Sequence, residues 1–396
     1  MLIKNVSILH GNELNFIKKT NVRIIDGKFE KIHPSLQLLT NEKSIDGEGF
    51  LLIPGLINCH THIGDSIAKD ITLNSSVNAK IHPVFGVKSK ILKKTNENHL
   101  STFMKISCES MLRKGITTFV DFREGGLDGI QLVKSAIKKL PIRSVLLGRI
   151  NYYQTSTEIK KNKPMESEKK TELTNLLENC DGIGISGANE NSSMTLKYYS
   201  LTRKLRAIHS SEMPESVLKS KKITGQSETK RALLMKPHFL VHMTHASKAD
   251  LRKAAKHTRG IVICPRANAA LAEGIPDIEL MKQQGCNLAL GTDNIMINSP
   301  DLFREMDFLW KFTMGIHKKR LDPKEILKMA TVNAEKILKK NIGIIAIGKM
   351  ADCLFIDKHS LDLEPMHDPY ASLIHRASET AIKAVMINGK IVHGKI

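Results

Sequence analysis

The stretch PGLINCHTHIGD, residues 54–65, decides the fold class that we expect for this chain of 396 residues. It opens with an apolar run typical of a buried strand and continues through His60 and His62. Residues two apart on a strand point to the same side, so these two imidazoles are expected to converge. A pair of this kind is by itself a weak sign of a metal site, because either histidine could be an ordinary core or surface residue.

Seven further apolar runs follow this one, with helical stretches between them. Eight such runs alternating with helices are typical of a parallel sheet covered by helices, and the count predicts an α/β fold closed into a (β/α)8 TIM-like barrel. Between Asn98 and Gly115 the apolar spacing predicts one of the helices, with Gly115 as its C-terminal cap. The seven runs are GITTFVDF (115–122), IRSVLLGRI (142–150), DGIGISG (181–187), LRAIHSSE (205–212), HFLVHM (238–243), GIVICP (260–265) and NLALGTD (287–293).

The two ends of the chain resemble each other and differ from the middle. Residues 1–53 and 342–396 both read as short strands separated by Gly and Asp. We therefore expect one small composite β-sandwich domain built from both termini, and a catalytic barrel over residues 54–341. The segment 63–98 is too long for an ordinary loop between a strand and a helix, and we interpret it as an active-site lid.

Composition excludes several classes of protein. The chain is 41% hydrophobic and 25% charged, which excludes a disordered polymer, and no apolar run approaches the ~20 residues needed to span a bilayer. Its formal net charge is +20, but the lysine-rich patches lack interleaved aromatic residues for base stacking. We expect no specific nucleic-acid partner, no membrane and a basic surface. The six cysteines form no CxxC pair, which favours a reducing compartment, and we expect a cytoplasmic protein.

Polar side chains stand at the ends of several of these apolar runs. His209 ends one run and Glu212 follows it, His242 ends the next with His245 after it, and Asp293 ends the last. In a (β/α)8 barrel the carboxyl ends of the strands form one face, so residues far apart in sequence meet there. Three imidazoles and one carboxylate make a suitable shell for one divalent ion, Zn²⁺ with Fe²⁺ or Mn²⁺ as alternatives.

The motifs PGLINCHTHIGD, AIHSSE, VHMTH, CPRANAAL and LGTDN together resemble the metal-dependent amidohydrolase superfamily, on its cytosine deaminase and chlorohydrolase-like branch. The resemblance covers essentially the whole chain. It implies that His60, His62, His209 and Asp293 are metal ligands and that Glu212 shuttles protons. It also implies that His242 hydrogen-bonds the hydroxide or the forming oxyanion, with His245 as the second choice. Asp293 is also expected to accept the proton of the attacking water.

The run GIGISGANE, residues 182–190, departs from the pattern of binuclear members of this superfamily. Those members carry a carboxylated lysine at the end of the fourth strand, and no lysine stands here. A site for one metal ion is therefore expected.

The function that follows is hydrolysis of a carbon–nitrogen bond other than a peptide bond, by a metal-bound hydroxide. Hydrolytic deamination of a nitrogen heterocycle or cyclic amidine is the first hypothesis. The alternatives are a cyclic amide hydrolase or chlorohydrolase-type enzyme, and a catalytically silent binding or scaffold protein with the same fold. The partner is a small-molecule substrate, and a homodimer would be ordinary for an enzyme of this size.

Weaker features allow both a structural and a functional interpretation. Strand alternation predicts that Cys59 faces away from His60 and packs against helices. Glu305 lies on an amphipathic helix and is interpreted as structural. For each of the remaining weak candidates, one interpretation is that it faces the substrate and the other is that it is a turn, cap or surface residue. These candidates are Asp65, Ser66, Asn189, Glu190, Pro265 and Asn268.

Overall fold

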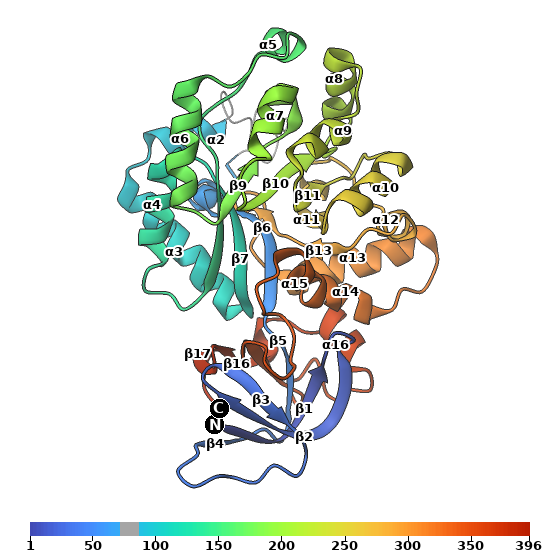
Figure 1. The fold of residues 1–396 in the computed structure, drawn as a ribbon. Coiled ribbons are helices and arrows are strands. Elements are labelled where there is room, and N and C mark those ends of the chain that lie inside the picture. The colour runs from blue at the N-terminus through green and yellow to red at the C-terminus, as the bar shows by residue number, and fades with distance from the viewer. Residues whose placement is uncertain (72–86) are drawn as a thin grey trace.

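A computed structural model describes residues 1–71 and 87–396 of the chain. Figure 1 shows a strand-and-helix layer above a separate sheet, and both ends of the chain lie in the lower sheet. The central sheet of the upper part pairs its strands in parallel, in the order β13-β12-β11-β10-β9-β8-β7-β6-β14. Its strands are β6 (Leu56–His62), β7 (Ile116–Arg123), β8 (Arg143–Gly148), β9 (Gly182–Ile185), β10 (Leu205–Ser210), β11 (Phe239–His242), β12 (Gly260–Ile263), β13 (Leu288–Leu290) and β14 (Asp293–Asn294).

The two ends of the central sheet are joined by the chain itself. Strand β14 follows β13 after Gly291 and Thr292, and it pairs with the first strand β6 through Asp293 and Thr61. Each of the eight apolar runs contains or overlaps one of the strands β6 to β13, as predicted. The eighth run also reaches the start of β14, so one segment of chain contributes to both ends of the sheet.

Strand β6 is buried along its whole length, which explains its continuous apolar sequence. Its pairing with β7 shifts register between Asn58 and Thr61, so the simple alternation of side chains is interrupted there. Cys59 joins the same buried cluster as Val120 and Phe122, and the ring of Phe122 lies 4.4 Å from that of His60. The same cluster contains Ala334 and Ile337 of the helix Val332–Leu338, so the prediction that Cys59 packs against helices stays a prediction.

Helices surround the central sheet (Figure 1). The predicted helix before β7 is confirmed as α3, which begins after the N-cap Asn96 and ends before Gly115 at φ +75°. The α-helices are α2 (Val87–Lys94), α3 (Glu97–Arg113), α4 (Gly126–Ile137), α5 (Ser156–Lys160), α6 (Ser167–Glu178), α7 (Ser193–Tyr199), α8 (Pro214–Thr224), α9 (Glu228–Ala232), α10 (Lys248–His257), α11 (Pro265–Ala270), α12 (Ile278–Gln283), α13 (Leu302–His317), α14 (Pro323–Met329), α15 (Val332–Leu338) and α16 (Pro369–His375). Short 3-10 helices are η1 (Ile63–Ala68), η2 (Ala188–Glu190), η3 (Leu233–Met235) and η4 (Glu379–Ala381).

The second sheet combines strands from both ends of the chain. Strand β5 pairs antiparallel with β15, with Pro54 opposite Cys353. The order is β17-β16-β15-β5-β1-β2-β3, with β4 paired to β1, so hydrogen bonds link all eight strands in one sheet and the two-layer sandwich stays a prediction. The strands are β1 (Leu2–His10), β2 (Asn15–Ile25), β3 (Lys28–Ile32), β4 (Ser44–Asp46), β5 (Phe50–Pro54), β15 (Cys353–Asp357), β16 (Ile382–Ile387) and β17 (Lys390–Gly394).

A partly buried ion pair connects the two sheets. Arg143, at the start of β8, donates from Nε to Asp352 at 2.8 Å, and Asp352 is fully buried just before β15.

The central part of the expected lid, residues 72–86, lies outside the described residues. Within the part of the chain that the structure describes, no helix is long and apolar enough to cross a membrane.

Candidate active site

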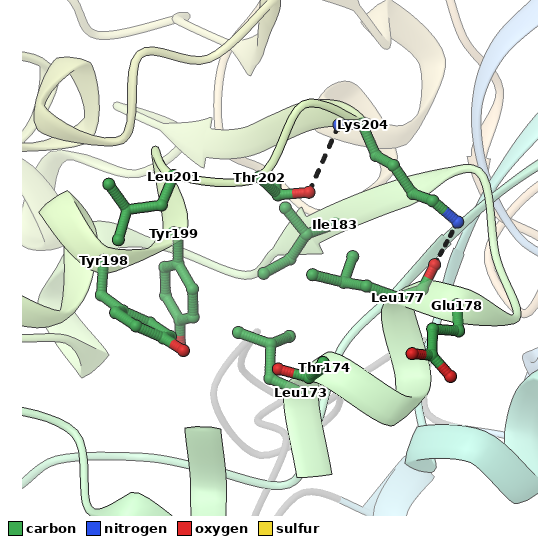
Figure 2. Close-up of a pocket in the computed structure, with 10 residues that line it drawn as sticks. All are labelled: Leu173, Thr174, Leu177, Glu178, Ile183, Tyr198, Tyr199, Leu201, Thr202 and Lys204. Atoms are coloured by element: carbon green, nitrogen blue, oxygen red, sulfur yellow. Dashed lines mark hydrogen bonds between the residues drawn. The ribbon is translucent and has the colours of Figure 1, made fainter. Parts of the chain in front are cut away.

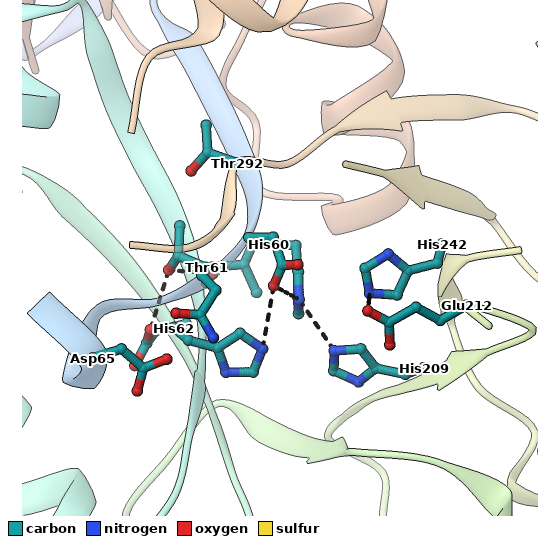
Figure 3. A network of polar contacts seen from close by, with 12 residues as sticks. His60, Thr61, His62, Asp65, His209, Glu212, His242 and Thr292 are labelled. Atoms are coloured by element: carbon teal, nitrogen blue, oxygen red, sulfur yellow. Dashed lines mark hydrogen bonds and ion pairs between the residues drawn. The ribbon is translucent and has the colours of Figure 1, made fainter. Parts of the chain in front are cut away.

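Three histidines and one aspartate converge at the carboxyl ends of the central strands. Figure 3 labels the three histidines, His60, His62 and His209. The Nε2 atoms of His60 and His62 lie 3.1 and 3.5 Å from Oδ1 of Asp293. The Nε2 atom of His209 lies 3.2 Å from that of His60. We call these four residues the histidine centre. The structure thus brings together the four side chains proposed as metal ligands from β6, β10 and β14.

The backbone that carries these residues adopts uncommon conformations. Ser211, His242, Met243 and Asp293 all have positive φ, at 52°, 69°, 59° and 58°. Residues with a Cβ atom adopt this left-handed region at an energetic cost, and they persist there where the surrounding structure holds them. At the ends of β10 and β11 and at the start of β14, these conformations turn the chain where the side chains of the site are presented.

Burial controls the protonation of the histidine centre. It lowers the pKa of His60 and moves the pKa of His62 and His209 well below the ordinary range, because a charged ring would lose its hydration. Burial alone would raise the pKa of Asp293, but the imidazoles of His60, His242 and His209 outweigh it and lower that pKa. Neutral rings around an ionised carboxylate are the protonation states that a metal ion requires.

The donor atoms fit a single divalent ion. Ligand atoms ~2.1 Å from one tetrahedral ion lie about 3.4 Å apart, which matches the three separations of the histidine centre. His209 donates from Nδ1 to the carbonyl oxygen of Ile185 at 2.9 Å, which leaves the lone pair of its Nε2 free for a ligand bond. Two groups have donor atoms that all lie within 4.8 Å of one another: His60, His62 and His209 form one, and His60, His242 and Asp293 form the other.

The predicted catalytic pair lies beside the histidine centre. Nε2 of His242 lies 3.5 Å from Oε1 of Glu212, and Nδ1 of His242 donates to Oδ1 of Asn268 at 3.3 Å. Burial raises the pKa of Glu212, and the carboxylate of Asp293 adds to this effect. A carboxyl group with a raised pKa can hold a proton near neutral pH and release it to a reacting group.

His242 and His245 take different positions, although both follow the same strand. His245 donates from Nε2 to the carbonyl oxygen of Glu273 at 2.7 Å, and it belongs to neither of the two groups of possible ligands. The structure therefore places His242, rather than His245, against the site.

A second polar cluster lies at the ends of β7 and β8. No motif in the sequence indicates that its residues lie together. Lys88 lies 2.9 Å from Asp65 and 2.8 Å from Glu124, and Arg149 lies 2.6 Å from Glu124. We call these four residues the ion network. Its members come from distant parts of the chain, and charged residues at such spacings are common on surfaces. Burial raises the pKa of Asp65 to about 7, whereas Lys88 and Arg149 overcome burial and lower the pKa of Glu124 to about 2.

Most of the weaker candidates contact other parts of the protein. Ser66 accepts a hydrogen bond from Ser107, and Glu190 accepts one from Ser186. Asn189 donates to the carbonyl oxygen of Ser216 and to Glu228. Pro265 begins helix α11 and Glu305 is fully buried against Arg266, in agreement with the turn and structural interpretations.

Phe122 fills the space between the fourth strand and the histidine centre. Its ring centroid lies 4.4 Å from that of His60 and 5.0 Å from that of His209. A Cβ atom built on Gly184 of β9 would approach the Phe122 ring to 2.6 Å. This packing leaves little room for a longer side chain at Gly184, which agrees with a site for one ion.

Several cavities in the described part of the chain lie outside the histidine centre. One of about 320 Å³ is lined mainly by apolar side chains of α6, β9 and α7, including Leu173, Ile183 and Tyr198 (Figure 2). Another of about 550 Å³ borders the ion network and is lined by Arg123 and Tyr153 among others. No member of the histidine centre lines either cavity.

Comparisons with known proteins agree with this geometry. The model of the Amidohydrolase family matches residues 51–392. A protein of Methanothermobacter thermautotrophicus, named provisionally as an aminohydrolase, is 34% identical over 99% of both chains. A 5-methylthioadenosine/S-adenosylhomocysteine deaminase of Thermoanaerobacter pseudethanolicus is 30% identical, over 99% of this chain and 93% of its own.

A solved structure shows the same fold. Atrazine chlorohydrolase from Arthrobacter aurescens, complexed with zinc, superimposes with a TM-score of 0.87 at 17% identity, over 99% of this chain and 95% of its own. The family model spans most of this chain, and the two relatives match this chain over nearly its whole length. This chain therefore belongs to the amidohydrolase family.

Proposed function

We propose that this chain is a metal-dependent hydrolase that deaminates a nitrogen heterocycle or cyclic amidine. The observation that carries the proposal is the histidine centre with the Glu212–His242 pair directly beside it. The proposed fold has two domains. One is a (β/α)8 barrel over residues 54–341, in which β13 and β14 count together as the eighth strand. The other is a composite β-sandwich of residues 1–53 and 342–396. A small molecule is the proposed partner, in a cytoplasmic protein that forms a homodimer without a specific nucleic-acid partner.

The proposed ligands of the ion are His60, His62, His209 and Asp293. Zn²⁺ is the preferred ion, because three imidazoles and one carboxylate suit it and a structural neighbour is complexed with zinc. A bound divalent ion lowers the pKa of a water molecule from ~15.7 toward ~7, which supplies a nucleophile at neutral pH.

The protein's own groups move the protons. Asp293 is ionised in its buried site and accepts the proton of the attacking water. Glu212 carries a proton to the ring nitrogen and helps to deliver one to the leaving amine, as its raised pKa permits. His242 donates from Nδ1 to Asn268, and as an imidazolium it also carries a proton on Nε2, which it donates toward the developing negative charge. Water and the amine-bearing carbon thereby yield a carbonyl group and ammonia.

The proposed substrate class comes from the relatives. The Thermoanaerobacter relative is named for 5-methylthioadenosine and S-adenosylhomocysteine, which both carry an exocyclic amine on a purine ring. An aminopurine fits the proposed roles of Glu212 and Asp293, because deamination requires a proton for the ring nitrogen and a base for water. Cyclic amides and chlorinated rings remain competing substrates for the same constellation.

Ammonia release from metal-loaded protein tests this proposal. The panel comprises 5-methylthioadenosine, S-adenosylhomocysteine, other purines, pyrimidines and pterins, with Asp293→Asn protein as the blank. We expect ammonia from at least one compound and none from the blank. Silence across the panel with metal bound would contradict deamination, and turnover of a cyclic amide or chlorinated ring would then assign the alternative.

A further inference from the structure

Glu228 is a buried carboxylate that lies behind Glu212, and nothing in the mechanism above uses it. It is the first residue of helix α9 and is only 4% exposed. Its Oε2 accepts hydrogen bonds from the backbone N–H of Ser211 at 2.9 Å and from the hydroxyl of Ser216 at 2.7 Å. Its Oε1 accepts one from the amide of Asn189 at 3.2 Å. Three donors from separate segments thus converge on one carboxyl group.

Ser211, which Glu228 holds, immediately precedes Glu212 and has φ +52°. Its carbonyl oxygen accepts a hydrogen bond from the backbone N–H of His245 at 2.9 Å, so both sides of this residue are fixed. Its hydroxyl lies 3.1 Å from that of Thr229, the next residue of α9. A left-handed conformation at a residue with a Cβ atom needs such support from its surroundings.

We infer that Glu228 is a positioning residue, which holds the Ser211 backbone so that the Glu212 carboxyl group faces His242 and the histidine centre. The inference rests on the proposed function, in which Glu212 transfers protons. Helix α9 contacts β10 directly through Thr229, so Glu228 connects a rigid helix to the turn that carries the proton shuttle. The direction of the Glu212 side chain is therefore set from outside the catalytic machinery.

The geometry also specifies what Glu228 must provide. The Ser211 N–H requires an acceptor oxygen, and either a carboxylate or an amide oxygen can supply one. Glu228→Gln keeps such an oxygen, whereas Glu228→Ala removes it and leaves the buried N–H of Ser211 without this partner. The two substitutions therefore separate loss of the hydrogen bond from loss of the charge.

Asp250 of helix α10 offers a matched control, because it contacts the same helix α9 from outside. It is 8% exposed and accepts a hydrogen bond at 3.0 Å from Ser227, the N-cap of α9, without contacting Ser211. Asp250→Ala thus weakens the attachment of α9 while it leaves the turn before Glu212 in place. A general loss of stability would affect both alanine variants alike.

The experiment compares the variants by turnover, metal content and crystal structure. We expect Glu228→Ala to lower kcat by roughly 10- to 100-fold, the scale of a misplaced catalytic group, with KM and metal content close to those of the wild type. Glu228→Gln should recover activity to within a few-fold of the wild type. Asp250→Ala should retain wild-type kcat. The metal-loaded Glu228→Ala structure should show Ser211 outside the left-handed region and Glu212 turned away from His242.

Three outcomes would overturn the inference: equal kcat in Glu228→Ala and Asp250→Ala, an equal loss in Glu228→Ala and Glu228→Gln, or an unmoved Glu212 in the Glu228→Ala crystal. Failure of the proposed function looks different. It would appear as no turnover by the wild type, or as full activity in Glu212→Gln. The crystal structures decide the position of Glu212 in either case.

Discussion

The histidine centre and the ion network lie at the carboxyl ends of the same sheet, yet they are built differently. In the ion network two carboxyl groups face two cationic groups at distances of 2.6–2.9 Å. In the histidine centre three neutral rings surround one carboxylate, and two ring nitrogen atoms lie 3.2 Å apart. The positive and negative groups of the ion network balance each other. In the histidine centre, by contrast, the converging lone pairs outnumber the protons available to them.

This difference separates a structural cluster from a binding site. Opposite charges that satisfy each other need nothing from solution, while converging lone pairs and an ionised carboxylate are stable together only with a cation. Both clusters are buried and both contain shifted pKa values, so a perturbed pKa alone would not distinguish them. What distinguishes the two clusters is whether their charged groups are paired with groups of opposite charge.

Removal of one ligand of the histidine centre should give the largest effect. We expect His209→Ala to lose the metal ion and to lower turnover by at least about 100-fold, since even outer partners of metal ligands change affinity by this amount. Elemental analysis and ammonia release measure the two losses. His245→Ala is the control, because His245 lies on the same face but outside the centre, and it should keep its metal. Retention of full metal content in His209→Ala would contradict the ligand assignment.

Disruption of the ion network should affect stability rather than metal binding. Glu124→Ala leaves Lys88 and Arg149 with less negative charge beside them, and we expect a loss of about 3 kcal/mol in the free energy of unfolding. The exposed pair Lys105–Glu109 is the control, and Glu109→Ala should cost under about 0.5 kcal/mol. Denaturant unfolding and elemental analysis check both variants. A metal-depleted Glu124→Ala protein would show that the two clusters are one site.

A third effect concerns Glu305, which is fully buried against Arg266. Burial raises the pKa of Glu305 from 4.5 to about 8, against the opposing charge of Arg266. Between these two pH values the folded protein keeps a proton that the unfolded chain has released, so the free energy of unfolding should fall as pH rises from about 4.5 to 8.

Glu305→Gln should remove this part of the pH dependence. Denaturant unfolding at pH 5 and pH 8 measures the difference between the two proteins. The same slope in both would place the titration elsewhere and would show that Glu305 stays ionised in the folded state.

The sequence predicted much of this arrangement because the signals were local or periodic. The eight apolar runs each correspond to a strand, and the positions of His60, His209, His242 and Asp293 at strand ends predicted their convergence. The helix ending before Gly115 followed from apolar spacing and a glycine that tolerates positive φ. Parallel strands bring their carboxyl ends together, so a correct strand assignment already specified the site.

The remaining features depend on contacts that no local pattern records. The register shift in β6 beside Cys59 arises from pairing with β7, which the sequence of β6 alone does not record. Glu228 and Lys88 stand among other charged residues in the sequence, and only the fold shows that they are buried against Ser211 and Asp65. The choice of His242 over His245 rested on resemblance, since both stand near the same strand end.

The pairing of β5 with β15 has a consequence for the order in which the protein is made. Strands β1 to β5 leave the ribosome first, but their sheet is completed by β15 to β17, which are synthesised after every strand of the central sheet. The segment β1 to β5 must therefore wait, with an unpaired edge at β5, until the whole central sheet has been translated. During that interval the unpaired edge is exposed to wrong partners, and the contact between Arg143 and Asp352 can form only after every strand of the central sheet has been made.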